Sequence, residues 1–81
     1  MERQEIESKV IEILVDKLGI DQESVKMESK LEDDFGADSL DCVEIIMELE
    51  HEFPIRIPDE DAESVETVKD IVDLVERHVW D

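Results

Sequence analysis

Few side chains in this sequence could carry out chemistry: Ser39 and Cys42 are the candidate nucleophiles, and His51 and His78 are the candidate bases. A catalytic serine or cysteine needs a base within hydrogen-bonding reach. His51 follows Ser39 by roughly three helical turns, and neither histidine is adjacent to Ser39 in the sequence. Ser39 also lacks the Gly-x-Ser-x-Gly setting of a nucleophile elbow. We therefore predict that the protein is not an enzyme.

The sequence also offers few side chains in an arrangement that could bind a metal ion. One cysteine and two scattered histidines do not make a zinc site. The acidic segment 59–70 resembles a calcium loop in its oxygen ligands, but Ser64 stands where that loop needs glycine and Asp70 where it needs a bidentate glutamate. We therefore exclude an EF-hand and predict no specific metal ligands. Loose divalent binding by clustered carboxylates stays open.

Ser39 is the one conspicuous hydroxyl, because it falls at the start of an expected helix. A phosphate ester there would meet unsatisfied backbone N–H groups and the positive end of the helix dipole. The ordinary alternative is that a serine at a helix start caps the helix. From the residues alone, helix capping by Ser39 is favoured over a phosphate ester as its role.

The elements that must position these residues are helical. Apolar residues recur at helical spacing over residues 2–18, over residues 38–53 and in a last helix that starts at Thr67. A short helical turn is expected over 59–64, after a link bracketed by two prolines. The sequence therefore predicts one all-α domain over 1–81, a small bundle of three main helices with a short helix between the second and the last.

Local signals mark where these helices begin and end. Gly19 is the expected left-handed stop of the first helix. Asp38 is the expected N-cap of the second, with Asp41 three positions later, and Thr67 and Asp70 have the spacing of a capping box. Between the first two helices runs a long connection, residues 20–37, with widely spaced apolar anchors at Val25, Leu31 and Phe35.

The helix over 38–53 carries apolar residues on two faces. Its broad face is expected to pack into the core and consists of Cys42, Ile45, Ile46, Leu49 and Phe53. The opposite face holds Leu40, Val43 and Met47, together with Glu44 and His51. An exposed apolar strip rimmed by acids is a docking surface. The alternative is that segment 59–64 or the long connection covers it.

The charge of the chain restricts its partners. Acidic residues outnumber basic ones by 26 to 8, a net charge of −18. Phosphate binding needs clustered Lys and Arg, so nucleic acid and anionic membrane surfaces are excluded. The acids concentrate between Leu31 and Glu66, where Arg56 is the only base. We therefore expect protein partners with basic patches.

The compartment follows from what the sequence lacks. The first residues do not have the pattern of a signal peptide. No apolar run approaches the roughly 18 residues of a membrane span. Cys42 is the sole cysteine, so no internal disulfide can form. We expect a cytoplasmic monomer that does not insert into membranes.

The stretch 32–41, Glu-Asp-Asp-Phe-Gly-Ala-Asp-Ser-Leu-Asp, resembles the attachment signature of the discrete, bacterial fatty-acid-synthesis type of acyl carrier protein. In that family Asp-Ser-Leu carries the prosthetic group. The similarity continues through 43–50 and Phe53, resumes at 57–62, and includes the Thr67–Val68 start of the last helix. It spans almost the whole chain, from Ile6 to His78.

The resemblance implies a function. Ser39, flanked by Asp38 and Leu40, would receive 4′-phosphopantetheine from coenzyme A, transferred by a separate holo-acyl-carrier-protein synthase. The arm would carry growing acyl chains as thioesters to fatty acid synthesis enzymes. The residues implied to dock on the basic patches of those enzymes are Leu40, Val43, Glu44, Met47 and Glu50. The residues expected to line an interior acyl pocket are Phe35, Ile46, Leu49, Ile57, Ala62, Val65 and Ile71.

Three positions depart from the family pattern: Cys42 stands where many relatives have threonine, and His51 and Arg56 replace acids. The tail 79–81, which includes Trp80, has no strong counterpart in the family. Two alternatives to a fatty-acid carrier stay open: a specialised carrier for polyketide, lipid A or another acyl-transfer pathway, and an acidic adaptor that carries no arm.

Overall fold

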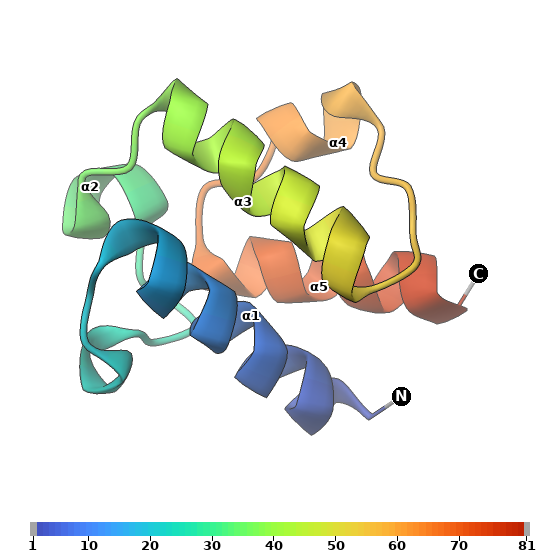
Figure 1. Ribbon diagram of the computed structural model, residues 1–81, viewed down its shortest axis with the longest axis horizontal. Helices are drawn as coiled ribbons and strands as arrows, with labels where there is room; N and C mark the ends of the chain where they lie inside the picture. The colour runs from blue at the N-terminus through green and yellow to red at the C-terminus, as the bar shows by residue number, and fades with distance from the viewer. Residues whose placement is uncertain (1, 81) are drawn as a thin grey trace.

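The computed structural model describes residues 2–80, without the side chain of Trp80. Every element in this range is helical (Figure 1). In chain order the elements are α1 (Arg3–Leu18), a 3₁₀ turn η1 (Gln22–Ser24), α2 (Leu31–Phe35), α3 (Ser39–Glu52), α4 (Asp59–Glu63) and α5 (Val68–Trp80). The expected all-α bundle of three main helices with a short helix before the last is thus confirmed.

The core lies between α1, α3 and α5, and α1 packs against both of the others (Figure 1). Each helix contributes one apolar stripe at helical spacing. The residues without measurable exposure are Ile6, Val10 and Leu14 on α1, Leu49 on α3, Phe53 after it, and Val68, Ile71, Val72 and Val75 on α5. Burial of these side chains is the main source of stability in a bundle this small.

Left-handed glycines end α1 and α2. Gly19 has φ +64° and donates its N–H to the Val15 carbonyl at 2.9 Å, which confirms the expected stop. Gly36 has φ +66° and closes α2 in the same way. Both positions need glycine because side chains bearing a Cβ rarely adopt positive φ.

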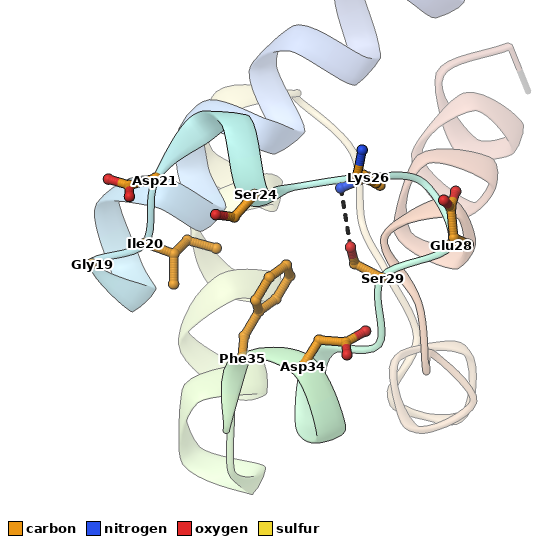
Figure 2. A pocket seen from close by; sticks show the side chains of 9 residues that line it. All are labelled: Gly19, Ile20, Asp21, Ser24, Lys26, Glu28, Ser29, Asp34 and Phe35. Atoms are coloured by element: carbon orange, nitrogen blue, oxygen red, sulfur yellow. Dashed lines mark hydrogen bonds between the residues drawn. The ribbon is translucent and has the colours of Figure 1, made fainter.

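The long connection 20–37 is more ordered than the sequence predicted, since it contains both η1 and α2. Its anchors Val25 and Leu31 are buried as expected, and Phe35 is half-buried. A surface pocket of about 590 Å³ opens between residues 19–29 and α2 (Figure 2). At its edge the Ser29 hydroxyl accepts the N–H of Lys26 at 3.1 Å. The sequence did not predict η1 and α2 because both are too short for apolar periodicity to reveal them.

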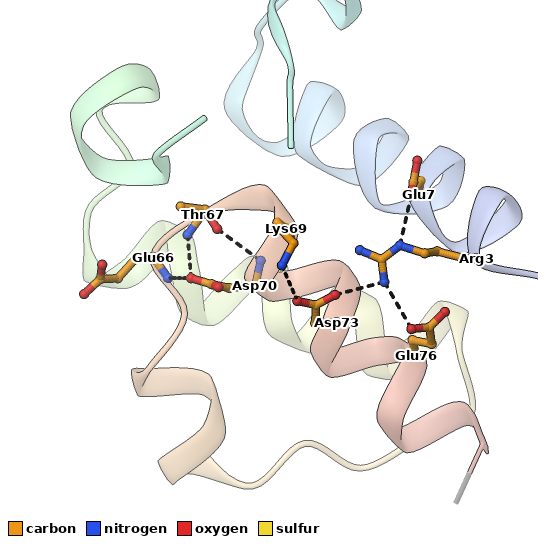
Figure 3. Close-up of polar contacts among 8 residues, drawn as sticks. All are labelled: Arg3, Glu7, Glu66, Thr67, Lys69, Asp70, Asp73 and Glu76. Carbon is orange, nitrogen blue, oxygen red and sulfur yellow. Dashed lines mark hydrogen bonds and ion pairs between the residues drawn. The ribbon is translucent and has the colours of Figure 1, made fainter. Parts of the chain in front are cut away.

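The start of α5 is fixed by the expected capping box (Figure 3). The Thr67 hydroxyl accepts the Asp70 N–H at 3.1 Å, and Asp70 Oδ2 accepts the N–H groups of Thr67 and Glu66, each at 3.0 Å. Burial raises the pKa of Asp70, but these hydrogen bonds outweigh it and hold that pKa below its ordinary value.

An ion-pair network joins the start of α1 to α5 (Figure 3). Arg3 Nη1 lies 2.9 Å from Asp73 Oδ1 and 3.1 Å from Glu76 Oε1, and Arg3 Nε lies 3.2 Å from Glu7 Oε2. The hydrogen bond with Asp73 raises the pKa of Arg3, against the lowering effect of its partial burial. The network spans the contact between α1 and α5.

Candidate functional site

Ser39 is the first residue of α3, and its side chain is exposed. The helix is capped by its neighbours instead. Asp38 Oδ1 accepts the Asp41 N–H at 2.9 Å, and Asp41 Oδ2 accepts the Asp38 N–H at 3.1 Å. The expected N-cap at Asp38 is therefore confirmed, and capping by Ser39 is wrong. Among the described residues, no hydrogen bond engages the Ser39 hydroxyl, so its oxygen is available to an enzyme from outside.

The surroundings of Ser39 suit a covalently attached phosphodiester. The backbone N–H groups of Ser39 and Leu40 donate no bond within the described part of the chain, as expected for a first helical turn. They and the helix dipole favour a negative group there. Asp38 and Asp41, however, place two carboxylates beside it. The site therefore fits a phosphate that is covalently held better than one bound from solution.

The second apolar face of α3 is open to solvent. Leu40 is 65% exposed, Val43 is 53% exposed and Met47 is 62% exposed. Glu44 and His51 are exposed beside them. The alternative that α4 or the long connection covers this strip is wrong. The exposed strip begins one residue after Ser39, so an enzyme that binds α3 here also reaches the serine.

Glu50, also expected on the docking surface, lies in a different environment. It is half-buried, and its Oε2 accepts the backbone N–H of Ile57 at 2.9 Å. Sequence reasoning missed this contact because it joins a helix to an irregular link seven residues further on. Glu50 therefore has a structural partner within the described chain, unlike the exposed residues of the strip.

Cys42 is a free, half-buried cysteine on α3. Burial raises the pKa of its thiol, and the charges of Asp41, Asp38 and Glu32 raise it further. The thiolate is the reactive form, so this cysteine is a weak nucleophile at neutral pH. Its position on the core-facing side agrees with the sequence expectation.

The residues expected to line an acyl pocket lie in or against the core. Leu49, Ile57 and Ile71 are buried, and the half-buried members are Phe35, Ile46, Ala62 and Val65. They do not share one cavity among the pockets described: Phe35 lines the pocket of Figure 2, and Val65 lines a separate one between α4 and α5. The acyl pocket stays a prediction.

The described residues show neither a metal site nor a membrane span. Within residues 2–80, no three His, Cys, Asp or Glu side chains converge in a way that could hold a metal ion. Over the same range, no helix combines the length and the apolar character that a membrane span requires.

Comparison with known proteins places the chain in a family. A family model described as a phosphopantetheine attachment site matches residues 8–75. The acyl carrier protein of Chlorobium phaeovibrioides is 53% identical over 75 residues, which cover 93% of this chain and 96% of that protein. The acyl carrier protein of Clostridium acetobutylicum is 56% identical over 70 residues, which cover 86% and 91%.

A solved structure agrees with these relatives. The crystal structure of the acyl carrier protein from Thermotoga maritima has a TM-score of 0.84 and 36% identity to this chain, and the match covers 99% of this chain and 93% of that one. The resemblance found in the sequence is thus confirmed. The chain belongs to the acyl carrier protein family: it is a non-catalytic carrier of acyl groups with a 4′-phosphopantetheine prosthetic group.

Proposed function

We propose that Ser39 is the residue that carries the arm, and that the chain serves fatty acid synthesis as a cytoplasmic monomer. One observation carries this proposal: an exposed hydroxyl, without a described hydrogen bond, stands at the capped start of α3 directly before an exposed apolar strip. Asp38 and Asp41 hold the helix start, so modification of the serine leaves the cap intact.

The attachment reaction uses the Ser39 oxygen as nucleophile. The oxygen attacks the phosphorus that bears the pantetheine of coenzyme A, and the bond from that phosphorus to the pyrophosphate bridge breaks. Adenosine 3′,5′-bisphosphate leaves, and the hydroxyl proton goes to a base. The described part of the chain offers no histidine beside Ser39, and the Asp38 and Asp41 carboxylates are engaged in the cap, so in this proposal a separate holo-acyl-carrier-protein synthase supplies the base. Once bound, the arm supplies a terminal thiol that holds acyl groups as thioesters.

Partner enzymes bind the exposed strip of α3 in this proposal. Leu40, Val43 and Met47 supply apolar area, and Glu44 supplies negative charge at its edge. Interfaces of this kind combine an apolar centre with a polar rim. The net charge of −18 favours enzymes with basic docking patches, both the synthase and the fatty acid synthesis enzymes.

The acyl chain enters the apolar interior in this proposal. The side chains that line its path belong to α2, α3, the link 54–58, α4, the turn between α4 and α5, and α5. The members are the seven expected from the sequence: Phe35, Ile46, Leu49, Ile57, Ala62, Val65 and Ile71.

The test is incubation of the protein with coenzyme A and a phosphopantetheinyl transferase, followed by intact-mass measurement. We expect one added phosphopantetheine group on the wild type and none on Ser39→Ala. Ser8→Ala, which changes an exposed serine of α1, is the matched control and should be modified fully. If the wild type could not be modified, the protein would be an adaptor that carries no arm. A modified Ser39→Ala would place the arm elsewhere.

A further inference from the structure

A hydrogen bond between Glu50 and Ile57 ties the link 54–58 to α3. Glu50 Oε2 accepts the Ile57 N–H at 2.9 Å. Pro54 and Pro58 have no N–H to donate, and the Ile55 N–H bonds locally to the Phe53 carbonyl. Within the described residues, the Glu50 carboxylate is therefore the acceptor that joins an N–H of the link to α3. We call this contact the Glu50 tether.

The tether holds part of the wall of the core. Ile57 is only 5% exposed, so its side chain belongs to the core while its backbone lies in an irregular link. The next residue, Pro58, is the N-cap of the five-residue helix α4. Asp61 is the residue that pins α4 to α5: its Oδ2 lies 3.3 Å from Arg77 Nη2 and 3.4 Å from His78 Nε2. The link and α4 are thus held at two points by polar contacts.

An acyl chain must move part of this wall to enter. Leu49 and Ile71 are fully buried and Ile57 nearly so, and the pockets described do not join them in one cavity. Helix α1 packs on both α3 and α5, whereas the link and α4 are short and α4 has no buried residue. The link and α4 are therefore the segment that yields most easily.

We propose that Glu50 is a positioning residue that sets how readily the interior opens to an acyl chain. With the tether formed, Ile57 stays against α3 and the interior is closed. When the tether breaks, the link moves outward and the chain enters between α3 and α4. This inference rests on the proposed function, since it needs an acyl group on Ser39.

The tether and the docking role expected for Glu50 require different properties of the side chain. Docking on a basic patch requires the negative charge, whereas the tether requires an oxygen that accepts the Ile57 N–H. Glu50→Gln keeps an acceptor oxygen and loses the charge, and Glu50→Ala loses both. Glu52→Ala is the matched control, because it removes the same charge from an exposed residue of the same helix, together with a 4.0 Å surface ion pair to Lys9 on α1.

The first measurement is hydrogen exchange of the Ile57 amide in the unmodified protein. We expect exchange to be about tenfold faster in Glu50→Ala, since a hydrogen bond to a charged group is lost. Glu50→Gln should stay close to the wild type, and Glu52→Ala should match it. A wild-type rate in Glu50→Ala, or equal acceleration in the Gln and Ala variants, would overturn the proposal.

The second measurement is cleavage of the acyl thioester by hydroxylamine, which attacks the carbonyl carbon and releases the thiol of the arm. Each variant is loaded at Ser39 with an acetyl group or with a saturated chain of medium length. We expect Glu50→Ala to protect the medium-chain thioester several-fold more than the wild type does, relative to acetyl. Glu50→Gln and Glu52→Ala should resemble the wild type.

The two measurements separate failure of the tether from failure of the proposed function. If no variant can be loaded, the proposed function fails, and the exchange of Ile57 is still measurable. If loading succeeds and the chain-length ratio in Glu50→Ala equals that of the wild type, Glu50 does not control access to the interior. If Glu50→Ala acted only through a general loss of stability, amide hydrogen exchange would be faster across the core as well as at Ile57. In that case Glu50→Gln would not restore the wild-type exchange rates.

Discussion

Asp38 and Asp41 each accept the backbone N–H of the other, at 2.9 Å and 3.1 Å, and Ser39 lies between them with its hydroxyl exposed. The reciprocal bonds satisfy two donors of the first turn of α3 without the serine. The residue proposed for modification is therefore held in position by its neighbours and contributes little to the fold.

This relationship predicts different stabilities for two neighbouring variants. Asp38→Ala should lower the free energy of unfolding by about 1 kcal/mol, the usual effect of losing an N-cap. Ser39→Ala should leave it nearly unchanged, because alanine is a good helix former just inside the helix start. Urea unfolding followed by circular dichroism measures both. Equal destabilisation by the two substitutions would mean that Ser39 takes part in the cap.

Docking through the exposed strip of α3 predicts salt-dependent kinetics. Glu44→Lys should slow acyl transfer by a fatty acid synthesis enzyme about tenfold at low salt, and the difference should shrink as salt screens the charges. Met47→Ala should slow transfer with little dependence on salt, because it removes apolar contact area. Glu23→Lys, an equal charge change in the exposed turn η1, is the control. Unaltered kinetics in both strip variants would place the partner surface elsewhere.

The capping box of α5 predicts an acid-dependent stability. The pKa of Asp70 is lowered in the folded state, so its ionised form stabilises the fold above the ordinary aspartate pKa of about 3.9. That contribution is lost as the pH falls through the folded-state pKa. The difference in unfolding free energy between wild type and Asp70→Asn should therefore be largest near neutral pH and shrink in acid. Urea titrations from neutral pH to about pH 3, where aspartates become protonated, measure this difference. Glu63→Gln, which changes an exposed acid, is the control. If the difference in unfolding free energy between wild type and Asp70→Asn did not depend on pH, ionisation of Asp70 would not be its cause.

The uneven charge predicts stabilisation by salt. Fourteen acids and one base between Leu31 and Glu66 repel one another in the folded state, and ions screen this over about 10 Å at 0.1 M. Magnesium and calcium should raise the melting temperature more than sodium does at equal ionic strength. The reason is that neighbouring exposed carboxylates share a divalent ion loosely, even though none of the described residues form a metal site. Thermal melts in the three chlorides measure this, and identical temperatures would leave screening as the only effect.

The sequence by itself determined where the helices lie and that Ser39 is the candidate for modification. Helical spacing, the glycine after α1 and the caps Asp38 and Thr67 act within a few residues of one another, so the sequence was sufficient to place the long helices to within one residue or so at the boundaries described. The two-sided pattern of α3 is likewise local, and it predicted the exposed strip.

The tertiary structure alone decided which polar contacts join distant segments. Arg3 reaches Asp73 and Glu76 on α5, and Glu50 accepts a bond from Ile57 in the link. Such contacts depend on how the helices pack, and any of the 26 acids could have been the partner of an arginine or a backbone N–H. Periodicity carries no signal for them, because the residues involved are brought together only when the core has formed.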